Sequence, residues 1–152
     1  MREILFRGKQ IDNGEWVEGY ISEYMRMPRD TNPYIVWVIE CKPKEIYEYE
    51  MYEVIPETVG QYTGLTDKNG KRIFEGDIVK THYVNTKKND FVEQIVFHNG
   101  RFCSMYKISE HGRMWANLPD GIPRLNKTPY MEWCEVIGNI HDNPELVKGE
   151  CT

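Results

Sequence analysis

Short stretches in which apolar and polar side chains alternate run along most of this chain, and turn residues separate one stretch from the next. Alternation with a period of two puts one face of an extended segment in the core and the other in water, so it predicts β-strands. About eight to ten such segments follow at the spacing typical of β-sandwiches and β-barrels. The clearest predicted strands cover residues 14–21, 34–39, 45–55, 77–84, 91–98, 101–107 and 130–140.

Asparagine–glycine pairs mark the sharpest reversals of the chain. Asn69-Gly70 and Asn99-Gly100 provide the positive φ angles that tight hairpin turns require. Glu75-Gly76-Asp77 repeats this turn chemistry just before an apolar run, and its aspartate is expected to accept hydrogen bonds from nearby backbone amides. We therefore expect a hairpin at the first pair that leads into a core strand, and a second hairpin that joins residues 91–98 to residues 101–107.

The segments between these strands are predicted to be irregular or short. Residues 85–90 form a polar loop, residues 110–128 carry scattered glycines and prolines, and a helical turn is expected after Pro144. We expect a smaller β-rich N-terminal lobe over residues 1–58 and a C-terminal lobe over residues 59–152. The chain is predicted to be mainly β, with short antiparallel strands in both lobes.

Composition and charge narrow the class of protein. With 40% hydrophobic and 12% aromatic residues, the chain has the composition of a folded protein rather than a disordered one. Its four cysteines lie far apart, which favours reduced thiols in the cytoplasm over a secreted disulfide framework. No apolar stretch approaches a signal-peptide core or a membrane span, so we expect a soluble cytoplasmic protein. The net charge of −5 counts against a protein held on nucleic acid mainly by phosphate contacts.

A family resemblance rests on segments that follow one another along nearly the whole chain. They are Arg2–Gly8, Gly14–Tyr20, Val54–Lys80 and Glu135–Glu145, and the most specific combination within them is Gly60–Asp67, Glu75–Asp77 and Ile137–Asn139. Together they resemble the YopX-like family of bacteriophage and prophage proteins. The resemblance implies a C-terminal lobe similar to an SH3-type β-barrel, a phage or prophage origin in a Gram-positive host, and no established activity. It carries over no catalytic or binding residues, so turn geometry explains the matched positions.

Catalytic and metal sites find little support in the spacing of the chemistry-bearing residues. His98 and Cys103 are expected to face each other across a hairpin turn, with His82 in the preceding strand, but they lack the dense ligand spacing of a structural zinc site. No motif predicts a contact between a histidine and the thiol of Cys103 or Cys134. The two carboxylates that flank Gly76 are expected to form a turn. We therefore expect no metal, no cofactor and no enzymatic activity.

Binding has more support than catalysis. Lysines on loops can contact phosphates, and an arginine beside a tryptophan can stack on a base or anchor a protein partner. The candidate partner-binding residues are Lys68, Lys71, Arg72, Lys87, Lys88, Arg113 and Trp115. Lysines that only solvate the surface, and a tryptophan that fills the space under a loop, explain the same residues.

The acidic, tyrosine-rich run from Glu40 to Glu57 indicates a second kind of contact. Tyrosines that alternate with glutamates suit an edge strand that pairs with another chain, and the candidate self-association residues are Tyr47, Tyr49 and Tyr52. A solvated strand with one buried face fits the same pattern. We predict a non-enzymatic protein-interaction or self-assembling module, a homo-oligomer that binds an unknown phage or host protein in the bacterial cytoplasm. The alternative is a nucleic-acid-binding module that uses the basic loops and the Arg–Trp pair.

Overall fold

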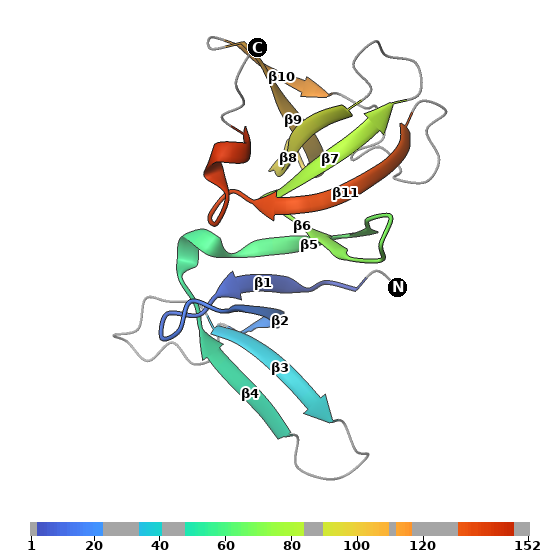
Figure 1. Ribbon diagram of the computed structural model, residues 1–152. Coiled ribbons are helices and arrows are strands. Elements are labelled where there is room, and N and C mark those ends of the chain that lie inside the picture. Colours follow the sequence, from blue (N-terminus) through green and yellow to red (C-terminus); the bar gives the residue numbers. More distant parts are fainter. Residues whose placement is uncertain are drawn as a thin grey trace. The chain divides into compact units, whose positions relative to one another are not determined.

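The computed structural model describes residues 3–22, 34–40, 48–83, 90–109, 112–116 and 131–147 of the chain (Figure 1). In these residues the chain forms eleven strands and two short 3-10 helices, so the predicted mainly β fold is confirmed. None of the described residues belongs to a helix long and apolar enough to cross a membrane. The chain divides into two compact units, residues 1–62 and 63–152, whereas the sequence places the boundary between residues 58 and 59.

The first unit is an antiparallel sheet with the strand order β4-β3-β2-β1. The start of β5 pairs with β1, and the 3-10 helix η1 (Pro56–Thr58) connects β4 to β5. Leu5, Ile35 and Val54 are buried, at 4%, 0% and 0% exposure, and mark the core of this unit. The strands are β1 (Phe6–Lys9), β2 (Trp16–Ser22), β3 (Tyr34–Glu40), β4 (Glu48–Glu53) and β5 (Gly60–Thr66).

The second unit is built on a five-stranded antiparallel sheet with the order β10-β9-β8-β7-β11. Within the described residues no pairing joins β10 to β11, so this sheet is open and the SH3-type barrel stays a prediction. The helical turn expected after Pro144 is confirmed as the 3-10 helix η2 (Pro144–Val147). The remaining strands are β6 (Arg72–Phe74), β7 (Asp77–Tyr83), β8 (Asp90–His98), β9 (Arg101–Ser109), β10 (Gly112–Ala116) and β11 (Met131–Asn139).

The strand β10 corrects the prediction that residues 110–128 are irregular. It pairs with β9, and the register shifts between Gly112 and Arg113. The sequence hides this strand because glycines and prolines surround it, and because strand formation depends on the neighbouring strand more than on intrinsic propensity. The predicted loop over residues 85–90 lies outside the described residues, except for Asp90, which begins β8.

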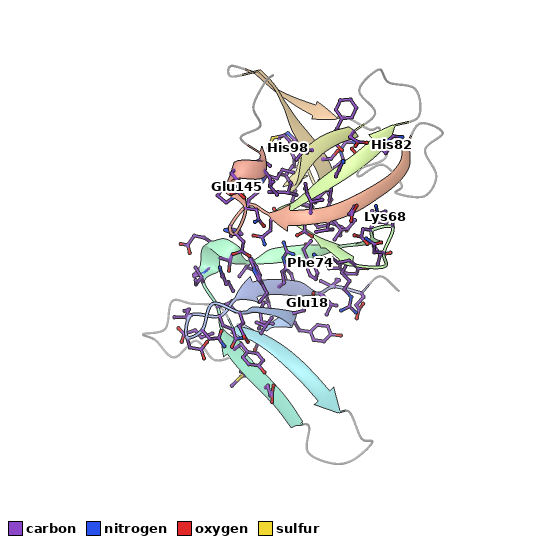
Figure 2. The ribbon with its side chains drawn as sticks, viewed as in Figure 1. Glu18, Lys68, Phe74, His82, His98 and Glu145 are labelled. Carbon is purple, nitrogen blue, oxygen red and sulfur yellow. The ribbon has the colours of Figure 1, made fainter. Side chains whose placement is uncertain are left out.

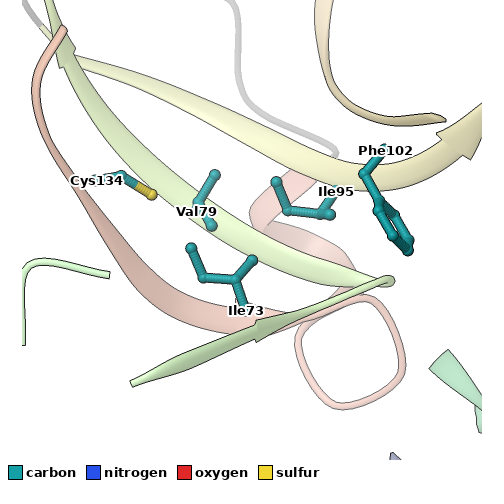
Figure 3. Packing of buried hydrophobic residues seen from close by; sticks show 5 residues of the cluster. All are labelled: Ile73, Val79, Ile95, Phe102 and Cys134. Carbon is teal, nitrogen blue, oxygen red and sulfur yellow. The ribbon is translucent and has the colours of Figure 1, made fainter. Parts of the chain in front are cut away.

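One face of the five-stranded sheet carries the apolar core of the second unit. Its buried residues come from β6, β7, β8, β9 and β11, and the half-buried Leu65 and Val136 pack against them. Figure 3 shows this cluster, which consists of Ile73, Val79, Ile95, Phe102 and Cys134.

The two asparagine–glycine pairs form different kinds of turn. Asn99 and Gly100 have φ angles of 50° and 79° and join β8 to β9, which confirms the predicted tight hairpin. At the other pair only Gly70 has a positive φ, 81°, so the prediction that Asn69 also adopts one is wrong. The amide of Gly70 donates to the carbonyl of Asp67, so this loop is a turn followed by one left-handed residue.

The third predicted turn precedes β7 and is confirmed. Gly76 has a φ of 83°, its amide donates to the carbonyl of Ile95, and its carbonyl accepts from the amide of Ile140. Asp77 is buried, and its carboxylate accepts a hydrogen bond of 2.8 Å from the amide of Phe74. A side chain that bonds to the backbone of its own turn is the role that the sequence predicts for this aspartate.

Candidate interaction surfaces

A two-stranded ribbon extends from the sheet of the first unit. The strands β3 and β4 pair along their lengths, from Tyr34↔Glu53 to Glu40↔Glu48. The strand β2 pairs with β3 only at Tyr34–Val36. Among the described residues, Trp37–Glu40 and Glu48–Glu50 therefore pair only with each other, and we name these two segments the β3–β4 arm (Figure 1).

Burial falls steadily along one face of β4 and its continuation. Residues 50, 52 and 54 share a face because side chains alternate along an extended strand. Val54 is fully buried, Tyr52 is half-buried and Glu50 is exposed. The arm therefore leaves the core of its own unit. An isolated two-stranded hairpin is only marginally stable in water, and among the described residues no third strand pairs with the arm.

The predicted self-association residues belong to this region of the chain. The hydroxyl of Tyr52 donates to the carboxylate of Glu50, and this hydrogen bond raises the pKa of Tyr52. Tyr49 lies on β4, although its side chain is outside the described part of the structure, and Tyr47 is outside it altogether. The strand β4 is the outermost strand of its sheet, as the prediction of an edge strand requires.

The basic residues of the β5–β6 hairpin do not form a free cationic loop. Lys68 forms an ion pair of 2.6 Å with Glu135 of β11, and its amide donates to the carbonyl of Cys134 (Figure 2). Lys71 is exposed, and Arg72 is half-buried in β6. The loop is therefore docked on β11, and a carboxylate neutralises its first lysine.

The other predicted partner-binding residues lie elsewhere. Lys87 and Lys88 are outside the described residues. Arg113 and Trp115 are on β10, which is at the opposite end of the strand order from β11. The loop that carries Lys68 is docked on β11 at one edge of the five-stranded sheet, and the Arg–Trp pair lies on the strand at its other edge, so the structure does not bring them together as a single site.

The histidines and cysteines of the second unit are also separated. His98 is opposite Arg101 and Cys103 is opposite Val96, so the expectation that His98 and Cys103 face each other is wrong. His82 pairs with the first residue of β8, whereas His98 is the last residue of that strand, roughly 25 Å away along it (Figure 2). Within the described residues no group of three or more histidine, cysteine, aspartate and glutamate side chains is placed to hold a metal ion.

His82 instead takes part in a surface cluster. Its Nδ1 lies 2.7 Å from Oδ1 of Asp90, and Nζ of Lys80 lies 2.8 Å from the other oxygen of the same carboxylate. The hydrogen bond with His82, followed by that with Lys80, lowers the pKa of Asp90. The cluster neutralises a second lysine of this unit, so it weakens the case for a phosphate-binding surface.

Three buried polar side chains of the second unit, those of Glu93, Thr81 and Ser104, form hydrogen bonds with one another. No sequence motif predicts this group. Glu93 is 1% exposed, and its two carboxylate oxygens accept hydrogen bonds from the hydroxyls of Thr81, at 2.8 Å, and Ser104, at 3.3 Å. Cys134 is opposite Thr81 in the register of β7 and β11. Two donors meet the need of a buried carboxylate for hydrogen bonds. The one available signal is parity, because Glu93 shares a strand face with Ile95.

This environment keeps the Cys134 thiol protonated. Burial, followed by the charge of Glu93, raises the pKa of Cys134 to about 12. A thiol needs its thiolate form to act as a nucleophile, so Cys134 is a core residue of the folded protein and has no activated sulfur. Cys103 is also buried and forms no disulfide.

We expect Cys134 to resist alkylation in the folded chain. At pH 8 iodoacetamide should modify Cys134 at least a hundredfold more slowly in the native protein than in urea, because both burial and the raised pKa withhold the thiolate. Mass spectrometry of the Cys134 peptide measures the two rates. Modification at equal rates in the two conditions would contradict the buried position of this thiol.

Comparisons with known proteins agree with the fold. The sequence matches the protein family described as "YopX protein" over residues 5–148. A crystal structure of "protein EF1440 from Enterococcus faecalis" superimposes with a TM-score of 0.53 and 24% sequence identity, over 97% of this chain and 99% of that chain. At this identity the likeness shows the fold alone. No curated protein matches the chain.

Proposed function

Since the chain belongs to the YopX family, we propose that it is a phage or prophage accessory protein that works as a non-enzymatic protein-interaction module in the host cytoplasm. The contact surface in this proposal is the β3–β4 arm. The second unit is the scaffold, and an SH3-type arrangement of its strands belongs to the same proposal.

The arm supports the proposal because an apolar run of β3 lies on a ribbon that pairs with no third strand among the described residues. Its β3 segment reads Trp37-Val38-Ile39, a run with the composition of a buried strand. Its β4 segment pairs only with β3 among the described residues, and Glu50 is exposed. Apolar residues on a two-stranded ribbon gain little stability alone. Pairing with a further strand would add a neighbour to this ribbon and satisfy the backbone groups of the edge.

A non-enzymatic role is consistent with the interior of the second unit. Its buried carboxylate, Glu93, accepts hydrogen bonds from two hydroxyls, and the neighbouring thiol of Cys134 is held protonated. Both groups sit in the packed core. Nucleic-acid binding stays the alternative prediction, although carboxylates face Lys68 and Lys80, and binding of oligonucleotides that weakens steeply with salt would support it.

Hydrogen exchange of the backbone amides tests the proposal. In the monomeric chain at low micromolar concentration, the amides of Trp37–Glu40 and Glu48–Glu50 should exchange at least a hundredfold faster than those of Ile78–Thr81, because the two strands of the arm pair only with each other among the described residues. Sedimentation velocity on the same samples reports the oligomeric state. If the chain is the predicted homo-oligomer and its copies pair through the side of β3 that faces away from β4, Val38→Pro should dissociate it, because proline removes a ladder donor.

Slow exchange of the arm amides in a chain that sediments as a monomer would contradict the proposal, because the arm would then be stable without a partner. The control variant is Val92→Ala, which changes an exposed apolar residue of β8 in the second unit. It should leave both the exchange of the arm and the sedimentation unchanged.

A further inference from the structure

We propose that the edge of β4 binds a basic, extended segment of another protein, which adds to the sheet as an antiparallel strand. This inference rests on the proposed function, because it names the chemistry of the partner for the same surface. It is carried by the edge of β4, which pairs with no further strand before Glu53 among the described residues, and by the acidic sequence of β4.

Backbone contacts define one end of the open stretch of β4. Directly after β4, Val54 forms an isolated bridge with Gln10, the amide of Ile11 donates to the carbonyl of Glu53 at 3.1 Å, and the amide of Ile55 donates to the carbonyl of Lys9 at 2.9 Å. This end of β4 is therefore already anchored to the segment after β1. An added strand would lie beside Glu48–Tyr52, a length of about 17 Å, which suits an extended segment of five residues.

The negative charge of β4 determines which kind of strand fits beside it. The strand β4 has the sequence Glu-Tyr-Glu-Met-Tyr-Glu, with three glutamates and no basic residue. It pairs with Glu40 at the far end of β3, and residues 1–60 as a whole contain twelve acidic and seven basic residues. Opposite charges on facing strands stabilise a sheet, and like charges directly opposite each other destabilise it. A strand with alternating lysine or arginine therefore fits this edge.

The same charges disfavour a second copy of the chain at this position. Within the stretch Glu48–Tyr52, full antiparallel pairing with a second copy places Glu50 directly opposite Glu50 of that copy. Each copy would also bring its own Glu48 to one end of the new pair. Self-pairing of this stretch thus concentrates four carboxylates, whereas a basic partner strand neutralises two.

Peptide binding tests the inference on the full-length chain. The probes are an eight-residue peptide of alternating lysine and valine, the same peptide with glutamate in place of lysine, and the lysine peptide with N-methylated backbone amides. At low salt the basic peptide should bind about tenfold or more tightly than the acidic one, from the sum of several facing charge pairs. Its binding should require unmodified amides, because strand addition uses the backbone ladder.

Variants locate the site. Glu50→Lys should weaken binding of the basic peptide about fivefold or more, whereas Glu15→Lys, the same charge change at an exposed residue that follows the β1–β2 turn, should change it less than twofold. Amide NMR shifts on binding should centre on Glu48–Tyr52. Circular dichroism of both variants shows whether the fold is kept.

Several results would overturn the inference. These are equal binding of the acidic and basic peptides, binding that survives N-methylation, equal effects of the two variants, no binding of the basic peptide at millimolar concentration, and a dimer of the chain that pairs through β4. None of them decides the proposed function, because the hydrogen exchange of the arm tests that separately. An arm that exchanges slowly in the monomer would reject the proposed function whatever the peptides do.

Discussion

Replacing Asp67 with alanine should lower the free energy of unfolding of the second unit by about 3 kcal/mol, although this residue sits in a turn. Asp67 is 7% exposed, and its carboxylate accepts three backbone hydrogen bonds. Oδ1 accepts from the amides of Asn69, at 2.8 Å, and Lys71, at 2.9 Å, and Oδ2 accepts from the amide of Val136 on β11, at 3.1 Å. The Asp67 side chain thus bridges the hairpin loop and links it to Val136 of β11, which is 69 residues further along the chain.

The expected loss of stability is large because the variant removes the charged acceptor of three backbone amides. Hydrogen bonds to a charged acceptor are stronger than neutral ones, and a buried donor left without a partner costs about 1–3 kcal/mol. Asp67→Asn keeps the shape but places an amide NH2 where an oxygen accepts, so it should cost about 2 kcal/mol. Urea denaturation followed by circular dichroism measures both changes.

The pH dependence of stability gives an independent readout of Asp67. Burial alone would raise its pKa, but the hydrogen bonds from Val136, Lys71 and Asn69 outweigh burial and lower the pKa below its ordinary value of 3.8. A lowered pKa in the folded state contributes stability that is fully present above pH 3.8 and is lost as the pH falls through the lower, folded-state pKa. The stability difference between wild type and Asp67→Ala should therefore be constant near neutral pH and shrink in acid.

Lys71→Ala is the matched control, because it removes an exposed side chain and keeps the backbone amide that Asp67 accepts. It should change stability by less than about 0.5 kcal/mol. An equal loss in Asp67→Ala and Lys71→Ala would show that the charge of the lysine, rather than the backbone network, stabilises this loop.

The turns of this protein are predictable from its sequence, whereas the contacts between distant segments are not. The turns at Gly70, Gly76 and Asn99-Gly100 are local, since a positive φ favours glycine or asparagine whatever the rest of the chain does. Most strands follow from the alternation of apolar and polar residues in the same local way, whereas β10 does not. The hydrogen bond from Val136 to Asp67 depends on a partner far along the chain, so the hairpin is predictable and its attachment to β11 is not.

The β3–β4 arm is likewise predictable from the sequence only in part. An edge strand near Tyr52 is predictable, because alternating tyrosine and glutamate suit a half-exposed strand. The length of the arm is not, because it depends on where β2 stops pairing with β3. Likewise, Lys68 looks like a free cation in the sequence, and only the fold brings Glu135 within 2.6 Å of it.

Some glycines of the family segments serve close packing instead of turns, which corrects the turn-geometry explanation of those positions. Gly8 is inside β1 and Gly138 is inside β11. A Cβ atom on Gly138 would lie 2.5 Å from Oδ1 of Asn143, and one on Gly8 would lie 2.9 Å from both Cβ and Cγ2 of Val54. Mid-strand glycine often marks such a close approach, but the sequence does not say what approaches.

Gly8→Ala should therefore destabilise the first unit by about 2 kcal/mol, as overpacking in a core typically does. Val54 is fully buried, and its side chain cannot rotate away because the clash involves its own Cβ. The backbone of β1 and the segment after β4 must separate instead, at the bridge between Gln10 and Val54. Urea denaturation measures the loss, and hydrogen exchange near Ile11 and Ile55 should rise with it.

Two further variants separate the clash from the loss of a glycine. In Gly100→Ala the new Cβ has nothing within 4 Å and meets only the positive φ of 79°, so the loss should be about 1 kcal/mol. In a Val54→Ala background two of the three contacts with residue 8 disappear, and Gly8→Ala should cost about 1 kcal/mol less than in the wild type. Strict additivity of the two changes would show that Gly8 does not act through Val54, and the close approach would then need another explanation.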